Sequence, residues 1–244
     1  MIIKQAMVLA AGLGTRMRPI TETTPKPLVR IGGKLMIDYV LDVLVEAGVE
    51  TVVVNVHHHA DQMETHLARE TRAEIRISNE RDQLMDSGGG LAKGLKLLDR
   101  DQPALVMNAD LFWVGERDDE PSNLVRLAQQ FDPSRMDMAM LCVEQERTTG
   151  HNGKSDFSMA DGGRLIRYVA GAPNPVVYAG ALAVMPHLFD DAPDGPFNLN
   201  IYFDRAIAAG RLFGTDLHGQ WLTVGTPDAI APAEAVVARY GGSR

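Results

Sequence analysis

Apolar residues in the first 110 positions form short runs of strand length, and these runs alternate with segments of helical periodicity. The apolar runs predict strands at 3–10, 51–56, 74–78 and 104–108. The periodic segments between them predict helices at 35–47, 60–69 and 90–98. This alternation indicates a parallel sheet with helices on both faces.

The second half of the chain follows a less regular pattern. It predicts strands at 136–143, 176–185 and 221–224, a hairpin within 156–169, and helices at 199–209 and from 227 to about 240. The hairpin turn is expected at Asp161-Gly162-Gly163. Together the two halves indicate one α/β domain, 1–244, with a mixed sheet in its second lobe.

The loop after the first predicted strand gathers glycine and positive charge. Residues 10–29 read AAGLGTRMRPITETTPKPLV. In an open α/β sheet, ligands bind at the carboxyl ends of the strands, where this loop begins. The amides of residues 11–15 can point at phosphate oxygens, and Arg16 adds a fixed bidentate cation. We therefore expect this loop to bind a polyphosphate.

Two better-known nucleotide loops fit this stretch badly. A dinucleotide fingerprint needs a third glycine where Met17 stands, and a P-loop lysine would not lie between Pro25 and Pro27, as Lys26 does. The two prolines instead hold Lys26 on a stiff, extended segment. A nicotinamide oxidoreductase remains an alternative because of the glycine loop, but Met17 and the clustered cations disfavour it.

Composition narrows the possible functions. The formal net charge of −8 disfavours a nucleic-acid partner. No apolar run of about 18 residues is present, so no membrane span is expected. The N-terminus lacks the layout of a signal peptide, and the single cysteine, Cys142, lies in an apolar run typical of a core. These features predict a cytoplasmic protein, whereas no oligomeric state follows from them.

The sequence LAAGLGTRMRP at 9–19, followed by PKPL at 25–28, resembles the signature of the sugar-phosphate nucleotidylyltransferases. The resemblance implies a Rossmann-like doubly wound, mostly parallel sheet of the nucleotide-diphospho-sugar transferase type, with a small sugar-binding β/α lobe. It implies a nucleotide-binding half at about 1–115 and a sugar-phosphate-binding half at about 116–244. It assigns catalysis to Arg16, Lys26 and Asp110.

The resemblance also implies the nucleotide contacts. The arginine would contact the β and γ phosphates and the lysine the α phosphate. The segment MDSGGG at 85–90 precedes a predicted helix, and its glycines would let the backbone approach a flat base. The expected nucleotide-binding residues are Ala10, Ala11, Gly12, Gly14, Thr15, Arg16, Lys26, Ser87, Gly88 and Gly89.

Polar residues elsewhere complete the expected site. Asp110 ends the NAD element after the fourth strand, where one carboxylate and substrate phosphates suit Mg²⁺. The resemblance assigns the sugar phosphate to Asn108, Asp156, Tyr178, Gly180 and Asn198, with Asn200 a weaker candidate. A purely structural role is an equal alternative for each of these. The three adjacent histidines at 57–59 point alternately to opposite faces, which indicates a loop cluster rather than a metal site.

One position departs from the family pattern. The family commonly carries W-x-D-x-G-T, whose aspartate binds metal, whereas this chain reads WLTVGT at 221–226. Thr223 supplies no anionic oxygen, so Mg²⁺ would rest on Asp110, the triphosphate and water. The alternative consequence is a weakened catalyst or a catalytically silent sugar-nucleotide sensor.

The predicted reaction joins a nucleoside triphosphate to a sugar 1-phosphate and releases pyrophosphate. The short chain and the SGGG segment most resemble family members that use UTP and N-acetylmuramate 1-phosphate. Mannose- and heptose-1-phosphate guanylyltransferases are the alternatives within the family. The expected partners are therefore the two small-molecule substrates and Mg²⁺, with no nucleic acid or membrane.

Overall fold

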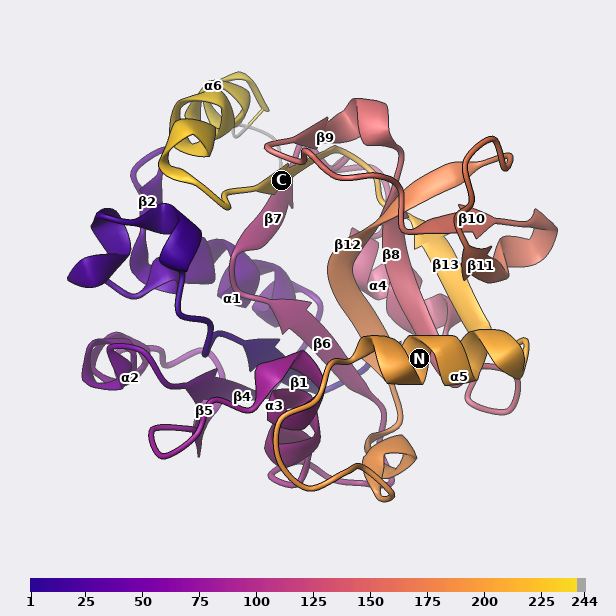
Figure 1. Cartoon of the computed structure of the whole chain (residues 1–244), viewed down its shortest axis with the longest axis horizontal. Helices are drawn as coiled ribbons and strands as arrows, with labels where there is room; N and C mark the ends of the chain where they lie inside the picture. Colours follow the sequence, from indigo (N-terminus) through magenta and orange to yellow (C-terminus); the bar gives the residue numbers. More distant parts are fainter. Residues whose placement is uncertain (241–244) are drawn as a thin grey trace.

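The computed structural model describes residues 1–240, and a nine-stranded mixed sheet forms its centre (Figure 1). Four neighbouring strands are parallel, in the order β5 (Glu74–Asn79), β4 (Thr51–Val56), β1 (Gln5–Leu9) and β6 (Ala104–Asn108). Their carboxyl ends lie at one edge of the sheet, so the loops that follow β1 and β6 are neighbours. The predicted parallel sheet is confirmed.

The long strand β12 (Pro175–Val184) connects the two halves of the molecule. Its second half pairs with β6 antiparallel, and its first residues pair with the β10–β11 hairpin. The other strands on this side are β8 (Met138–Val143), β10 (Phe157–Met159), β11 (Leu165–Arg167) and β13 (Leu212–Asp216). The mixed sheet and the hairpin around 161–163 are confirmed.

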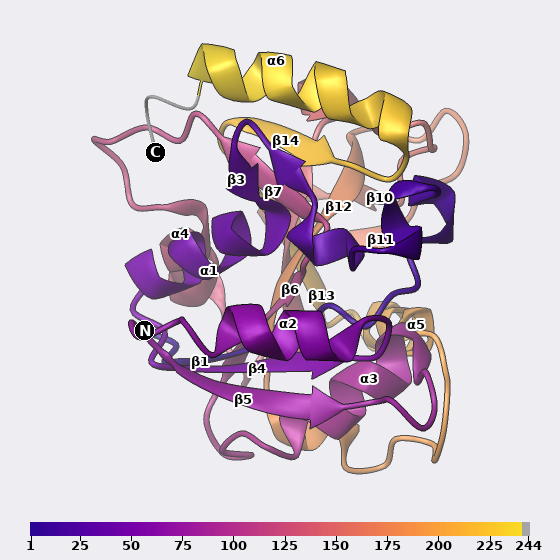
Figure 2. The same cartoon turned by 90° about the vertical axis from the view of Figure 1, so that its left-hand side faces the viewer.

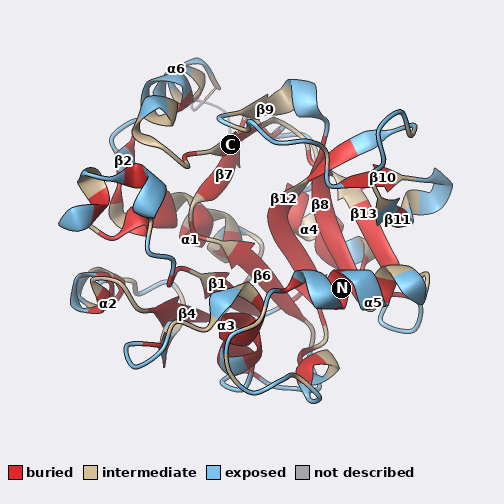
Figure 3. Cartoon of the chain, viewed as in Figure 1, coloured by how far each residue is buried: buried red, intermediate tan, exposed pale blue. Residues whose placement is uncertain are grey.

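Helices cover both faces of the sheet. One face carries α1 (Met36–Glu46), α2 (Ala60–Leu67) and α4 (Asn123–Gln130), and the other carries α3 (Asp86–Leu95) and α5 (Asn200–Ala208). Figure 2 shows α1 and α2 on the same side of β4 and β5. Alternate residues of β1 face the two layers: Ala6 and Val8 pack with α1, and Met7 packs with α3. The buried strands between the layers are red in Figure 3.

A third, smaller apolar cluster joins the two ends of the chain. It includes Met17 from the signature loop, Met36 from α1 and Ala233 from α6. Its strands and C-terminal helix are β2 (Arg30–Ile31), β7 (Leu111–Val114), β14 (Gln220–Thr223) and α6 (Ile230–Tyr240). Two short strands lie next to them: β3 (Lys34–Leu35) pairs with β2, and β9 (Thr148–Thr149) pairs with β14. The packing anchors the loop after β1 against the C-terminal helix, which lies at the top of Figure 2.

Short 3₁₀ turns complete the connections. They are η1 (Thr15–Met17), η2 (Ile20–Glu22), η3 (Lys26–Leu28), η4 (Gln145–Arg147), η5 (Asp161–Gly163), η6 (Pro186–Phe189) and η7 (Pro227–Ala229).

Cys142 is fully buried, as predicted, and this burial raises the pKa of its thiol. Within residues 1–240, none of the helices combines the length and the apolar character that crossing a bilayer requires.

The sequence-based prediction placed the start of α3 four residues too late, at position 90. The helix begins at Asp86, so Ser87 and the three glycines form its first turns rather than a preceding loop. Glycine is a poor helix former, which hid this start. Packing overrides the propensity, because a Cβ atom at Gly88 would lie 2.3 Å from Cε2 of Phe197.

Candidate active site

A cavity of about 300 Å³ opens at the carboxyl ends of β1 and β6. It brings together residues that are distant in sequence, from the signature loop, the loop after β6 and the start of α3. Seven of the expected residues line it: Ala10, Ala11, Gly12, Lys26, Ser87, Asn108 and Asp110. The predicted catalytic lysine and the predicted metal ligand therefore share one cavity.

The signature loop presents its backbone amides outward. Gly14 adopts a left-handed φ of 61°, and a Cβ atom there would lie 2.9 Å from Cγ2 of Thr21. The carbonyl oxygen of Gly14 accepts hydrogen bonds from the amide of Met17 and the hydroxyl of Thr21. Within residues 1–240, no acceptor binds the amides of residues 11–14. These amides are available to an anion.

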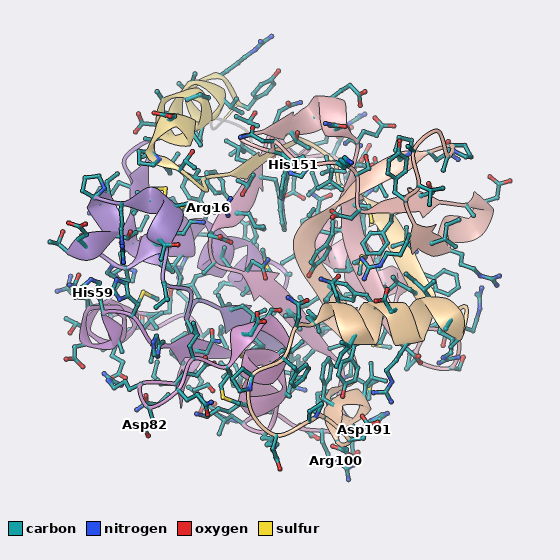
Figure 4. The ribbon with its side chains drawn as sticks, in the orientation of Figure 1. Arg16, His59, Asp82, Arg100, His151 and Asp191 are labelled. Atoms are coloured by element: carbon teal, nitrogen blue, oxygen red, sulfur yellow. The ribbon has the colours of Figure 1, made fainter. Side chains whose placement is uncertain are left out.

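Arg16 and Thr15 lie in η1, next to this loop. Arg16 is exposed, and its guanidinium approaches the backbone after β14: a Cβ atom at Gly225 would lie 3.5 Å from Nη1 (Figure 4). Arg16 and Gly14 are not among the residues that line the cavity. The arginine therefore stands outside the cavity, on the side of the loop that meets the C-terminal segment.

Lys26 and Asp110 form an ion pair across 84 residues of sequence. Nζ of Lys26 lies 2.5 Å from Oδ2 of Asp110. The lysine side chain is only 10% exposed, whereas that of the aspartate is 37% exposed. Pro25 is extended, but Lys26 and Pro27 belong to the 3₁₀ turn η3, so the extended segment predicted around Lys26 is wrong beyond Pro25. The nearly buried ammonium of Lys26 thus lies beside the accessible carboxylate of Asp110.

A buried polar network supports the loop from behind, and the sequence-based prediction missed it. Asn55 accepts a hydrogen bond from the amide of Ala10 at 2.6 Å and donates to Oε1 of Glu80 at 2.7 Å. Oε2 of Glu80 accepts from the amide of Met85 at 3.1 Å. Asn55 and Glu80 are 3% and 1% exposed. This network fixes the start of the signature loop relative to α3.

Replacing Gly90 with alanine tests this network. The new Cβ atom would lie 2.7 Å from Nδ2 of Asn55 and 2.8 Å from Oε1 of Glu80. Although alanine gains about 1 kcal/mol of helix propensity over glycine, we expect a net loss of about 1–3 kcal/mol in unfolding free energy from overpacking. Urea unfolding measures this loss.

The double variant Asn55→Ala/Gly90→Ala provides the control for the Gly90 variant. Removing the Asn55 side chain relieves one of the two close contacts. The two substitutions should therefore destabilise the protein by less than the sum of their separate effects. An unchanged unfolding midpoint for Gly90→Ala alone would contradict the tight packing.

Gly88 and Gly89 face a chain segment and do not line the cavity. Their amides donate to the carbonyl oxygen of Phe197 at 2.9 and 3.2 Å. A Cβ atom at Gly89 would lie 2.6 Å from the carbonyl oxygen of Gly195. The glycines therefore let the 195–197 segment cross α3 closely, and Ser87 is the residue of this group that reaches the cavity.

A second cavity, of about 220 Å³, adjoins the first. The two share Leu9, Ser87 and Asn108. Four of the five residues expected at the sugar phosphate line it, namely Asn108, Asp156, Tyr178 and Asn198. The fifth, Gly180, does not: it lies at a bulge in β12 with φ of 72°, where a Cβ atom would lie 2.5 Å from a methyl carbon of Leu111.

Asp156 and Tyr178 are held rigidly in the second cavity. Oδ2 of Asp156 accepts from the amide of Tyr178 at 2.9 Å, and the tyrosine ring meets Phe203 edge-to-face at 5.5 Å. Burial, reinforced by the nearby acidic groups Cys142 and Asp156, raises the pKa of the Tyr178 hydroxyl. The hydroxyl therefore stays protonated at neutral pH and can donate a hydrogen bond.

Thr223 lies beside Asp110, as the family pattern requires of this position. It pairs with Leu111 between β14 and β7, and the amide of Val224 lies 3.5 Å from the carbonyl oxygen of Asp110. Within residues 1–240, no group of three or more His, Cys, Asp or Glu side chains could hold a metal ion. The accessible carboxylates that line the first cavity are those of Asp110 and Asp86, and Asp110 is the one beside Lys26.

The three histidines after β4 anchor loops, but the predicted alternation to opposite faces is wrong, because the ring centroids of His58 and His59 lie 4.0 Å apart. The ring of His57 contacts the carbonyl oxygen of Glu80 at 2.7 Å, and that of His58 contacts the carbonyl oxygen of Thr21 at 2.8 Å. His59, labelled in Figure 4, lies 3.1 Å from the carbonyl oxygen of Glu22. Two of the three thus tie the start of α2 to the signature loop.

Comparisons with known proteins show the family to which the chain belongs. A family profile described as Nucleotidyl transferase matches residues 5–158. The N-acetylmuramate alpha-1-phosphate uridylyltransferase of Caulobacter vibrioides is 44% identical over 241 residues, covering 96% of this chain and 97% of that protein. The protein of the same name from Neisseria meningitidis is 30% identical over 239 residues, covering 97% and 99%. The chain therefore belongs to the nucleotidyl transferase family, which confirms the resemblance.

A solved structure confirms the predicted fold class. The inositol-1-phosphate CTP transferase from T. maritima superposes with a TM-score of 0.79, covering 98% of this chain and 96% of that chain. Its sequence is only 14% identical, so this likeness concerns the fold alone.

Proposed function

We propose that the protein transfers uridylyl from UTP to N-acetylmuramate 1-phosphate, giving UDP-N-acetylmuramate and pyrophosphate. The observation that carries this proposal is the Lys26–Asp110 pair in the first cavity, because that cavity shares Asn108 with the second one. The two similar uridylyltransferases support the choice of substrates. Residues 1–115 would bind the nucleotide, and residues 116–244 the sugar phosphate.

The reaction is an in-line displacement. A phosphate oxygen of the sugar 1-phosphate forms a bond to the α phosphorus of UTP, and the bond from that phosphorus to the bridging oxygen of pyrophosphate breaks. The attacking oxygen is already anionic, so no general base is needed. The protein must instead neutralise and align two anions.

Different residues of the site would bind different parts of the two substrates. The ammonium of Lys26 would lie against the α phosphate, where negative charge gathers in the transition state. The amides of residues 11–14 would hold the leaving pyrophosphate oxygens. Arg16, outside the cavity, would contact the outer phosphates. Tyr178 and Asp156 would bind the sugar.

The donor set fits a magnesium ion, which we propose as the cofactor. Asp110 offers one accessible carboxylate, and Mg²⁺ is usually bound by one or two carboxylates together with substrate phosphates and water. The bound ion would supply positive charge to the phosphate oxygens. Asp110 is itself held by Lys26 before substrate arrives.

Replacing Thr223 with aspartate should strengthen the response to Mg²⁺. A second carboxylate would stand beside Asp110, so the Mg²⁺ concentration that gives half-maximal activity should fall roughly tenfold. Titrating Mg²⁺ at saturating substrates measures this change. Thr223→Asn is the matched neutral control, and equal effects of both variants would contradict an electrostatic role for this position.

A substrate panel tests the proposed function. Pyrophosphate release is measured with UTP, CTP, GTP, ATP and dTTP against N-acetylmuramate, mannose and heptose 1-phosphates. Release only with UTP and N-acetylmuramate 1-phosphate is the expected result. Release with GTP and mannose 1-phosphate would favour a guanylyltransferase, and triphosphate binding without release would favour the sensor.

Because these substrates are cytoplasmic metabolites, we place the protein in the cytoplasm.

A further inference from the structure

N-acetylmuramate differs from N-acetylglucosamine by a lactyl ether on O3, which ends in a carboxylate. A site that selects the first sugar over the second needs a group that recognises this anion. We propose that Arg167 receives the lactyl carboxylate and so determines the choice of sugar. This inference rests on the proposed function and names the residue that would make it specific.

Arg167 is the cationic residue among those that line the second cavity. The acidic residue in the same lining, Asp156, is already engaged by the amide of Tyr178. The chain as a whole carries a formal charge of −8, so a second anionic group on the substrate would otherwise meet an unfavourable field. Arg167 supplies the positive charge of this lining, although Asp156 and Asp204 lie beside it.

The guanidinium is oriented before any ligand binds. Its Nε donates to Asp204 at 2.8 Å, its Nη2 donates to Asn200 at 2.8 Å, and it lies 5.0 Å from the centre of the Phe157 ring. Within residues 1–240, no group accepts a hydrogen bond from Nη1. The side chain is 37% exposed. Nε and Nη2 of the guanidinium are thus held by protein acceptors, whereas Nη1 is available to a carboxylate.

Asn200 connects Arg167 to a further polar residue of the cavity by hydrogen bonds. Its Nδ2 donates to Oδ1 of Asn198 at 2.8 Å, and its backbone amide donates to the same oxygen at 3.0 Å. Arg167, Asn200 and Asn198 therefore form one connected polar wall, which is built from β11 and the start of α5. A ligand on this wall meets fixed donors.

The position of Arg167 favours a distant substituent over the transferred phosphate. Arg167 pairs with Phe157, which in turn pairs with Val176 near the start of β12. The register of β6 with β12 pairs Met107, the residue before Asn108, with Ala181, five residues further along. At about 3.3 Å per residue this is a separation of at most about 16 Å along the strand. That span suits a pyranose ring with its lactyl arm, when the 1-phosphate lies near Asn108.

The test compares two sugars that differ only in the lactyl group. Arg167→Gln is assayed with UTP and either N-acetylmuramate 1-phosphate or N-acetylglucosamine 1-phosphate, and the Kd values of the two UDP-sugars are measured by titration calorimetry. We expect kcat/KM for the muramate substrate to fall about 30-fold, with the same loss in UDP-N-acetylmuramate affinity, and the glucosamine values to change by less than about twofold. Arg167→Lys should recover part of the loss.

Arg205→Gln is the control. Arg205 lies on α5, pairs with Asp191 and does not line the cavity. Equal losses for both sugars in Arg167→Gln would overturn the proposal, since a structural or phosphate-binding arginine serves both. An unchanged muramate rate would also overturn it. Wild-type protein that turns over another pair of substrates but not the muramate would refute the proposed function, and this inference with it.

Discussion

Replacing Lys26 with alanine is expected to lower kcat by about a hundredfold or more, the usual scale for losing one preorganised transition-state group. The ammonium is nearly buried, so its charge acts in a medium of low dielectric and is poorly replaced by water. Because the transferred phosphate gains negative charge in the transition state, the loss should fall on kcat more than on KM for UTP.

Steady-state rates of pyrophosphate release measure the effect of Lys26→Ala. Lys34→Ala is the matched control, because Lys34 pairs with Asp42 away from the cavity and its loss should leave the rate within about twofold. Circular dichroism checks that both variants fold. A Lys26→Ala rate close to that of the wild type would remove the lysine from the mechanism.

Replacing Asp110 with asparagine should lower kcat by about a hundredfold or more as well. The substitution preserves shape but removes the anionic oxygen, which both holds Lys26 and offers a ligand to Mg²⁺. Thr223, at the neighbouring family position, supplies no carboxylate that could compensate. Added Mg²⁺ should therefore restore little activity.

The Asp110 variant is tested by titrating Mg²⁺ up to high concentration at fixed substrates. Asp101→Asn, at an exposed position outside the cavity, is the control and should keep the wild-type response. If Asp110→Asn kept the wild-type half-saturating Mg²⁺ concentration, the ion would have to bind elsewhere.

Local sequence signals predicted most of the fold and many of the residues that line the two cavities. The β-branched run at 51–56 and the apolar run at 104–108 form strands with those same bounds. β7 was missed, because a four-residue run after a tight turn gives little periodicity to detect. α4 was overlooked although its eight residues carry a helical pattern, with Leu124, Leu127 and Ala128 buried on one face. Short elements depend on tertiary packing more than on their own sequence.

The supporting residues of the site could not be predicted in the same way. Asn55 and Glu80 lie 25 positions apart, and only the pairing of β4 with β5 brings them together. The one local signal was the polar Asn55 inside the apolar run TVVVNV, which indicates a buried amide that needs partners. Arg167 gave no signal in the sequence, because its role depends on where the β10–β11 hairpin folds.

The most direct test of the central claim is ³¹P NMR of UTP, N-acetylmuramate 1-phosphate and Mg²⁺ with the wild-type protein. The account predicts that signals of a sugar-linked diphosphate and of pyrophosphate grow in equal amounts while those of both substrates decline. Unchanged spectra, or release of inorganic phosphate without the sugar-linked diphosphate, would contradict it.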